Sequence, residues 1–350
     1  MLSAVSKSRK AEVNMSVRVA INGFGRVGRS IIRACLGRKD IEIVAVNTRA
    51  KPEILAHLLT YDSVHGKIKA DVSLKNGSLV VDGKEIRVTN ITDSIDRLPW
   101  KDMQVDVVME STGKFRKKDQ CLPHIAAGAK KVIIAAPGKG IDGTFCMGVN
   151  EETYDPKKHH IISNASCTTN CLAPIVKVLH DTFTVKRGLM TTVHSYTMDQ
   201  RLLDGSHDDL RRARAGALSI VPTTTGAART VAEVIPDLKG KLDGLALRVP
   251  TPNVSLVDFV AELGRNVTIQ DVNGALKTAA EGRLKGIVEY CEKELVSVDF
   301  TSSPYSAVVD APLTNVIDGN LAKVLAWYDN EMGYACRMRD LALYIIGKEK

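Results

Sequence analysis

Apolar runs and amphipathic stretches alternate through the first third of the chain. The runs VRVAIN, starting at Val17, and IEIVAVN, ending at Asn47, are almost continuously apolar, as in strands buried on both faces. Helical spacing follows each run, in RVGRSIIRACLGRKD and KPEILAHLLTYD, and returns in KKDQCLPHIAAGA between the short runs DVVMEST and KKVIIAA. Buried strands that alternate with helices predict an α/β unit with a mostly parallel sheet.

This pattern changes twice along the chain. SLVVDGKEIRV alternates apolar and polar positions around Asp82 and Gly83, which predicts a β-hairpin. Beyond residue 160 the strand-like runs GLMTTVHSYT, LDGLALRVP, VSLVDFVAEL and KVLAWYDNE are separated by long polar connections, with a helical pattern at IQDVNGALKTAAEG. We predict an α+β unit with a mostly antiparallel sheet here, followed by a final helix in ACRMRDLALYIIG.

The length supports two domains, because 350 residues exceed one typical hydrophobic core. We expect residues 16–166 and 331–350 to form one domain and residues 167–330 to form the other. Residues 1–15 are basic and without periodicity, which predicts a disordered tail or a start placed upstream of Met15; the alternative is a targeting segment, for which the stretch is short. No apolar run reaches the length that crosses a bilayer, so we expect no membrane partner.

Composition and charge narrow the class of protein. Hydrophobic content of 44% and charged content of 25% are ordinary for a soluble globular protein. The seven cysteines show no paired spacing and no signal peptide precedes them, so we expect free thiols in the cytoplasm. The net charge of +8 favours anions, either nucleic acid or small phosphorylated metabolites. Aromatic residues make up only 5% of the chain, too few to stack single strands, so nucleic acid is not expected as the main partner.

A glycine-rich turn follows the first predicted strand. Gly23, Gly25 and Gly28 have the G-x-G-x-x-G spacing, between a buried strand and a helix. In a dinucleotide site the first glycine permits the turn, the second lets the backbone approach a pyrophosphate, and the third lets helix and strand pack closely. The N–H groups of Arg26 and Val27 would face the phosphates at the helix start. The alternative is a purely structural turn.

The end of the second predicted strand lacks an expected acid. Sites selective for NAD usually carry a carboxylate here, bonded to the ribose 2′-hydroxyl. This chain has Thr48 and Arg49 after Asn47, and the next carboxylate is Glu53. A hydroxyl beside cations could receive a 2′-phosphate, which favours NADP; the alternative is an ordinary exposed loop.

The segment SNASCTTNCLAP is typical of a strand that runs into a helix, with Cys167 at the helix start. A helix N-terminus favours the thiolate, so we expect a lowered thiol pKa and a nucleophile for carbonyl carbon. The histidine of TTVHSYT, His194, is the candidate base. A buried structural cysteine and a satisfied core histidine are the alternatives. Cys171, one turn further along, is expected to pack inward. The chain has no second cysteine pair at zinc-ligand spacing, so no metal site is predicted.

Three further segments suit phosphate oxygens. RRARAG and LRVPTPN supply arginines with forked donors, and PTTTGAA supplies hydroxyls beside a glycine. Each segment is weak evidence for a phosphate site by itself, because a threonine-rich turn or a surface arginine is usually without function.

Together these motifs resemble a known family. INGFGRVGR, ASCTTNCLAP, TTVHSYT, LRRARAGA, PTTTGAA, RVPTPNVS and WYDNEMGY are similar to the phosphorylating glyceraldehyde-3-phosphate dehydrogenases, from about Val17 to Ile346. The resemblance implies a Rossmann-type dinucleotide-binding domain, an α+β catalytic domain and a homotetramer. It also implies that a loop from Tyr196 to Ser219 reaches the cofactor of a neighbouring subunit.

The resemblance implies a reaction through a thioester. Cys167 would attack the aldehyde of glyceraldehyde 3-phosphate, and His194 would act as the base while hydride passes to the nicotinamide. Inorganic phosphate would then release 1,3-bisphosphoglycerate. The implied site for the substrate's phosphate is Thr197, Asp199 and Arg248. The attacking phosphate would use Ser166, Thr168, Arg212, Thr225 and Gly226, and Asn330 and Tyr334 would lie near the nicotinamide.

The chain departs from the family pattern in three places. NAD-specific members carry aspartate in place of Thr48, and a bulky apolar residue and a proline in place of Gly205 and Ser206. NADP-using members resemble this chain at Ser206, so we expect NADP to be preferred, or both cofactors to be used. Met198 replaces a common asparagine and leaves the local geometry open. Erythrose 4-phosphate as the substrate, or a binding or scaffold role without catalysis, are the alternative functions.

Overall fold

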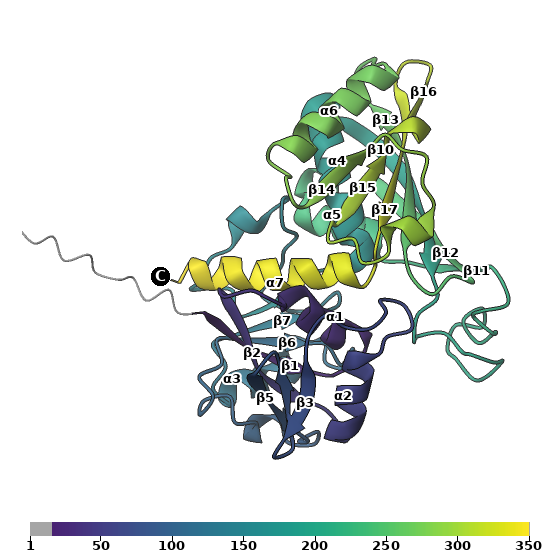
Figure 1. Ribbon diagram of the computed structural model, residues 1–350. Helices are drawn as coiled ribbons and strands as arrows, with labels where there is room; N and C mark the ends of the chain where they lie inside the picture. Colours follow the sequence, from purple (N-terminus) through teal and green to yellow (C-terminus); the bar gives the residue numbers. More distant parts are fainter. Residues whose placement is uncertain (1–15, 350) are drawn as a thin grey trace, which may run out of the picture.

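The computed structural model describes residues 16–349, so the expected basic tail lies outside the described residues. Its strands form two separate sheets, which Figure 1 shows one above the other with the C-terminal helix α7 between them. The predicted fold class is confirmed: a mostly parallel sheet is followed by a mostly antiparallel one. The domain boundary at residue 166 stays a prediction, with the strands of the two sheets on either side of it.

The first sheet has the strand order β3-β4-β5-β2-β1-β6-β7-β9-β8. Its centre is parallel, and β3, β4 and β5 form an antiparallel edge that contains the predicted hairpin. The strands are β1 (Val17–Asn22), β2 (Ile41–Asn47), β3 (Val72–Lys75), β4 (Ser78–Val81), β5 (Lys84–Thr89), β6 (Val107–Glu110), β7 (Lys131–Ile134), β8 (Gly143–Thr144) and β9 (Ile161–Ser163).

Helices cover both faces of this sheet, as the continuous apolar runs predict. In β1, Ile21 lies in one hydrophobic cluster with α1, α2 and α7, and the neighbouring Ala20 lies in a second cluster with α3 on the other face. Tight burial on both faces explains why polar residues are missing from the middle of these strands. The helices are α1 (Arg26–Cys35), α2 (Pro52–Thr60), α3 (Lys118–Ala126) and α7 (Met332–Gly347).

The second sheet has the order β11-β12-β10-β13-β17-β15-β14, and β16 pairs with β17. It is antiparallel except for the parallel pairs β10–β12 and β14–β15. The strands are β10 (Val185–Ser195), β11 (Val221–Thr224), β12 (Leu242–Val249), β13 (Ser255–Leu263), β14 (Val288–Cys291), β15 (Ala307–Asp310), β16 (Asn315–Ile317) and β17 (Leu321–Tyr328). Of these, β11, β14, β15 and β16 were not predicted, because they are too short to show a period.

One face of the second sheet is covered by α4 (Cys167–Phe183), α5 (Ala227–Val234) and α6 (Ile269–Glu281). Alternation along β13 shows this one-sided burial, since Val257, Phe259 and Ala261 are buried and the residues between them are partly exposed. One-turn 3₁₀ helices complete the described chain at η1 (Ile95–Arg97), η2 (Glu151–Thr153), η3 (Pro236–Leu238), η4 (Ser297–Phe300) and η5 (Ala311–Leu313). No helix among residues 16–349 is both long and apolar enough to cross a membrane.

The glycine-rich turn between β1 and α1 has the geometry that its spacing predicts. Gly23 has φ of 101°, in the region that favours glycine, and a Cβ there would lie 2.7 Å from the backbone nitrogen of Thr112. A Cβ on Gly28 would lie 2.3 Å from the carbonyl oxygen of Gly23, so this glycine allows the helix to approach the strand. A Cβ on Gly25 would meet nothing within 4 Å, so space remains open above this position.

The different surroundings of Gly28 and Gly25 predict different outcomes for an alanine substitution at each position. Gly28→Ala should lower the free energy of unfolding by about 1–3 kcal/mol, because the new methyl group overlaps backbone that must move. Gly25→Ala should change it by less than about 1 kcal/mol and weaken dinucleotide binding, because the methyl group enters the open space above the turn. Urea unfolding and a dinucleotide titration of both variants measure this contrast. Equal loss of stability in the two variants would contradict it.

Candidate active site

Cys167 is held at the start of α4 by local backbone structure. β9 ends at Ser163, and Ala165 then adopts φ of 55° before the helix begins. Ser166 is the N-cap residue, and its hydroxyl accepts a hydrogen bond of 3.0 Å from the backbone N–H of Thr169. The predicted strand-to-helix connection is therefore confirmed, and it leaves Cys167 as the first residue of the helix.

His194 reaches the thiol from the end of β10. Its Nε2 lies 3.6 Å from the Sγ of Cys167, so residues 27 positions apart in the sequence meet. The Nδ1 atom lies 2.7 Å from the carbonyl oxygen of Ser195 and donates its proton to it. This bond leaves the lone pair of Nε2 facing the thiol, which is the arrangement that a general base needs.

Burial decides the protonation of both groups. Removal from water lowers the pKa of His194 to about 3, with a further contribution from the charge of Arg248. Burial also raises the pKa of the Cys167 thiol, and the charge of Arg248 opposes this rise without overcoming it. The expectation of a lowered thiol pKa is therefore wrong: loss of solvent outweighs the helix end. The pair is a neutral thiol beside a neutral imidazole at neutral pH.

Arg248 approaches this pair from β12. The parallel register of β10 and β12 places Arg248 opposite His194, so the two side chains emerge together. The Nη1 atom of Arg248 lies 2.9 Å from Nδ1 of His194 and donates to the carbonyl of Ser195 at 3.0 Å and to the hydroxyl of Thr197 at 3.4 Å. Two residues of the expected substrate-phosphate site, Thr197 and Arg248, are thus in contact.

Arg212 forms a second cationic centre. Its Nε donates to the hydroxyl of Thr223 at 2.9 Å and its Nη2 to the carbonyl of Thr224 at 3.2 Å, while Nη1 donates to the carboxylate of Asp199. Asp199, expected beside Thr197, therefore binds the other arginine. Thr223 was missed, although the segment PTTTGAA had been singled out, because only contacts across β11 show which threonine faces Arg212.

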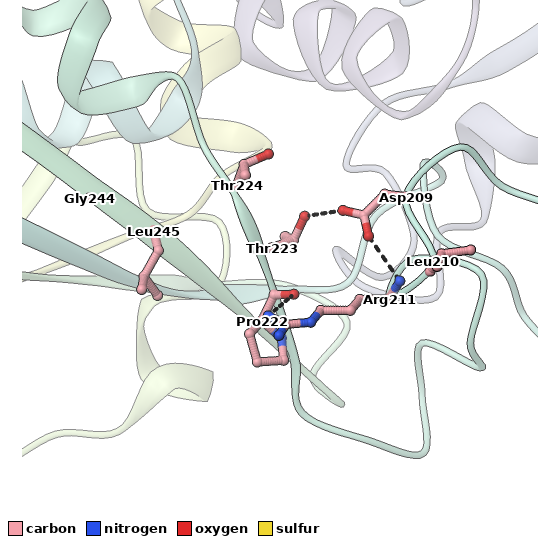
Figure 2. A pocket seen from close by; sticks show the side chains of 8 residues that line it. All are labelled: Asp209, Leu210, Arg211, Pro222, Thr223, Thr224, Gly244 and Leu245. Atoms are coloured by element: carbon pink, nitrogen blue, oxygen red, sulfur yellow. Dashed lines mark hydrogen bonds between the residues drawn. The ribbon is translucent and has the colours of Figure 1, made fainter.

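A cavity of about 500 Å³ lies beside these anchors, between strands β11 and β12 and the loop that follows β10, and Figure 2 shows the side chains that line it. Thr223 donates to the carboxylate of Asp209 at 2.6 Å, between two of the lining side chains. The lining does not include Cys167 or His194. It consists of Asp209, Leu210, Arg211, Pro222, Thr223, Thr224, Gly244 and Leu245.

The other expected phosphate ligands lie at the starts of two helices, Ser166 and Thr168 at α4 and Thr225 and Gly226 at α5. The hydroxyl of Ser166 also meets that of Thr169, at 2.8 Å, and Thr168 is buried with its hydroxyl 2.9 Å from the Tyr328 hydroxyl. Thr225 accepts from the backbone N–H of Ala227 at 3.2 Å, and Gly226 is the N-cap of α5.

Tyr328 was missed by the sequence reasoning. Its hydroxyl joins those of Thr168 and Thr192, each at 2.9 Å, and its ring stands edge-on to that of His194 with centroids 6.0 Å apart. The alternation in KVLAWYDNE predicted a strand and could have placed this tyrosine on the covered face. The sequence offered no signal for its polar partners.

The two residues expected near the nicotinamide are hydrogen-bonded to sequence neighbours of Cys167 and His194. The side-chain oxygen of Asn330 accepts from the hydroxyls of Ser195 at 2.8 Å and Ser255 at 2.9 Å, which leaves its amide nitrogen to donate elsewhere. Tyr334 is buried and donates to the carbonyl of Ala165 at 3.0 Å, two residues before the nucleophile.

The expected phosphate and ribose contacts lie at the ends of β1 and β2. Arg26 and Val27 begin α1, where their N–H groups are free of the helix ladder. Thr48 is partly exposed and accepts from the N–H of Ala50 at 3.3 Å, and Arg49 is exposed. Open space above Gly25 and the free N–H groups of α1 fit a dinucleotide pyrophosphate.

Comparison with known proteins decides the family. Residues 17–118 match the model of the glyceraldehyde 3-phosphate dehydrogenase NAD binding domain, and residues 166–330 match that of the C-terminal domain. The chain is 60% identical over 334 residues to glyceraldehyde-3-phosphate dehydrogenase of Geobacillus stearothermophilus, covering 95% of this chain and 99% of that protein. Glyceraldehyde-3-phosphate dehydrogenase 2 of Trichormus variabilis and dehydrogenase 1 of Bacillus subtilis are each 57% identical, with the same coverage.

The chain belongs to the glyceraldehyde-3-phosphate dehydrogenase family. The resemblance expected from the sequence motifs is thereby confirmed, over nearly the whole chain. In this member of the family, Ser206 lies exposed on the loop that follows β10, where its carbonyl accepts from Nε of Arg201 at 2.8 Å.

The opposing effects on the thiol pKa can be separated by removing one charge. Arg248→Gln should raise the pKa of Cys167 further, because Arg248 is the nearest cation that favours the thiolate. The midpoint of the pH profile for alkylation by iodoacetamide should move upward, and a midpoint one pH unit higher lowers the rate at neutral pH about tenfold. Arg187→Gln is the control, since Arg187 lies on β10 but pairs with Glu262 on the surface. An identical profile in wild type and Arg248→Gln would contradict the assignment.

Proposed function

We propose that the protein oxidises D-glyceraldehyde 3-phosphate with phosphate and NAD(P)⁺ to 1,3-bisphosphoglycerate, as a cytoplasmic phosphorylating dehydrogenase. The observation that carries the proposal is the 3.6 Å contact between the Cys167 thiol and the His194 imidazole, with Arg248 and Arg212 held at separate positions around it. A thiol, a base and two anion sites are the groups that this reaction requires, and it needs no metal. The names of the relatives agree with it.

Cys167 and His194 carry the covalent steps. The Sγ atom attacks the aldehyde carbon as Nε2 takes the thiol proton, and Nε2 passes that proton to the carbonyl oxygen, which becomes the hydroxyl of a thiohemiacetal. Nε2 then accepts the hydroxyl proton as hydride leaves the same carbon, which yields a thioester. The nicotinamide dinucleotide supplies the hydride acceptor. A neutral His194 suits both steps, because its lone pair is free at neutral pH.

The two arginines give two phosphate groups separate places. Arg248 with Thr197 would bind the phosphate of the substrate, since both adjoin His194. Arg212 would receive the attacking inorganic phosphate, with Ser166, Thr168, Thr225 and Gly226 as the further ligands that the family resemblance implies. An oxygen of that phosphate bonds to the thioester carbon and the Cys167 thiolate leaves. Asp199 would hold Arg212 in place rather than contact phosphate, because two anions repel.

The proposed reaction is tested with two aldehydes and with phosphate. Wild type should reduce the cofactor faster with glyceraldehyde 3-phosphate than with erythrose 4-phosphate, and steady turnover should require phosphate. Cys167→Ala should lose more than about 10⁴-fold in kcat/KM, because the covalent path is closed, while cofactor binding stays. Preference for erythrose 4-phosphate would favour that alternative. Loss of all activity in clean wild type would favour the scaffold role.

A homotetramer agrees with the exposed surface of the loop after β10. Large apolar side chains there are unusually open to solvent, at 82% for Leu202, 83% for Leu210 and 77% for Leu218. Such a surface favours burial against another subunit. We propose that Ser206 on this loop reaches the adenosine end of a neighbouring subunit's cofactor, as the family resemblance implies.

We further propose that NADP is preferred, or that both cofactors are used. Thr48 and Arg49 follow β2 where a carboxylate would repel a 2′-phosphate. The Thr48 hydroxyl is engaged only by a 3.3 Å bond from Ala50, so it stays able to bind a phosphate oxygen. Arg49 is exposed and adds positive charge at the same end of the sheet.

Thr48→Asp tests this cofactor preference. The new carboxylate would bond the ribose 2′-hydroxyl of NAD and repel the 2′-phosphate of NADP by about 1–4 kcal/mol. The NADP/NAD ratio of kcat/KM should therefore fall by about one to three factors of ten. Ser73→Asp, on the exposed edge strand β3, is the control for an added charge. If wild type already prefers NAD tenfold or more, Thr48 is an ordinary loop residue.

A further inference from the structure

Four chain segments converge on one buried ion network between the two sheets. Arg26, the first residue of α1, donates from Nε to Glu331 at 2.7 Å and from Nη2 to the other oxygen of the same carboxylate. Its third nitrogen, Nη1, donates to Asp62 at 2.6 Å. His65 completes the network, with Nε2 3.0 Å from Glu331 and Nδ1 2.9 Å from the hydroxyl of Ser302.

The network is closed and largely removed from water. The side chains of His65, Asp62 and Glu331 are 1%, 4% and 12% exposed. Burial alone would raise the pKa of Asp62, but hydrogen bonds from the backbone N–H of His65 and from the Arg26 side chain lower it to about 2. Arg26 and His65 likewise hold the pKa of Glu331 below its usual value against the effect of burial. Each nitrogen of the Arg26 guanidinium has a carboxylate partner, although the side chain is 25% exposed.

Each end of the network lies at or next to an expected cofactor contact. Arg26 follows Gly25 in the turn that fits the pyrophosphate. Glu331 follows Asn330, which is bonded to Ser195, the residue after His194, and whose amide nitrogen is left to donate. The forked pairing of a guanidinium with a carboxylate fixes orientation as well as distance. The Arg26–Glu331 pair thus links the two places that one bound dinucleotide must touch together.

Asp329 fixes the same segment from the other side. One of its oxygens accepts from the N–H groups of Glu331 and Met332, and the other accepts from Asn253 at 2.7 Å and from the N–H of Ser302 at 2.7 Å. The backbone around Asn330 is therefore anchored to the second sheet, and the carboxylate of Glu331 points back to the first.

We propose that Arg26, Glu331 and His65 are positioning residues that set the nicotinamide-facing Asn330 at a fixed place relative to the pyrophosphate turn. This rests on the proposed function, because hydride transfer to the cofactor is the step that needs this alignment. The network does not contact the reacting atoms. Its effect is on the geometry of transfer, where a misplacement of about 1 Å can cost on the order of a hundredfold in rate.

Glu331→Gln tests the proposal, since it keeps the shape of the side chain and removes the charge that Arg26 and His65 share. Two quantities are measured on the full chain: the rate of the first burst of reduced cofactor, and the affinity for ADP-ribose, which carries the pyrophosphate but no nicotinamide. If wild type uses NADP, the probe is instead ADP-ribose that carries a 2′-phosphate. The burst rate should fall about tenfold to a hundredfold, and the affinity for the nicotinamide-free probe should change less than about twofold.

Asp340→Asn is the matched control, because it removes another carboxylate that pairs with arginines along α7, away from Asn330. It should leave the burst rate unchanged. The proposal is overturned if Glu331→Gln weakens ADP-ribose binding as much as it slows the burst, if it changes neither, or if Asp340→Asn slows the burst equally. If Glu331→Gln does not fold, His65→Gln is judged by the same two readouts.

Failure of the proposed function gives a different result. Wild type that shows no burst with glyceraldehyde 3-phosphate refutes the reaction and not the network. The ratio of dinucleotide to ADP-ribose affinity then decides the network, because only the intact dinucleotide reaches Asn330. That ratio should fall in Glu331→Gln and stay unchanged in Asp340→Asn; an unchanged ratio in Glu331→Gln overturns the proposal.

Discussion

The contact between the Cys167 thiol and the His194 imidazole is the interaction on which the rest of the structure depends. It joins the first residue of α4 to the end of β10, and neither element can place its side chain alone. Cys167 packs against the main hydrophobic cluster of each sheet, so its position is set where two cores meet. A shift of either core would change the 3.6 Å separation, which couples the chemistry to the packing of the whole molecule.

Exclusion of water shapes the electrostatics of this contact. Burial keeps both the thiol and the imidazole neutral, and the cation of Arg248 pushes both groups toward their deprotonated forms. A neutral base is useful to a reaction that must remove two protons in turn. In a site of low dielectric, the same cation acts strongly on the charge that develops during attack and on a bound phosphate group.

Irregular features of the second sheet bring the cations to this pair. β10 and β12 run parallel inside an otherwise mostly antiparallel sheet, and their register sets Arg248 opposite His194. β11 then pairs with β12 and carries Thr223, which holds Arg212. This strand order holds Arg248 and Arg212 where the charges of both act on His194. Between the sheets, the ion network of Arg26 and Glu331 plays the corresponding part for the cofactor side.

The sequence by itself determined what depends on neighbours along the chain. The helices of the first sheet and its strands other than β3 and β8, the turn at Gly23 and the cysteine at a helix start follow from local spacing, capping and backbone sterics. Tertiary structure decided the short strands, the parallel pair β10–β12, the pairing of Arg212 with Asp199 and the raised thiol pKa. These depend on contacts between distant segments and on burial, and no local pattern records how much water a folded chain removes from a given atom.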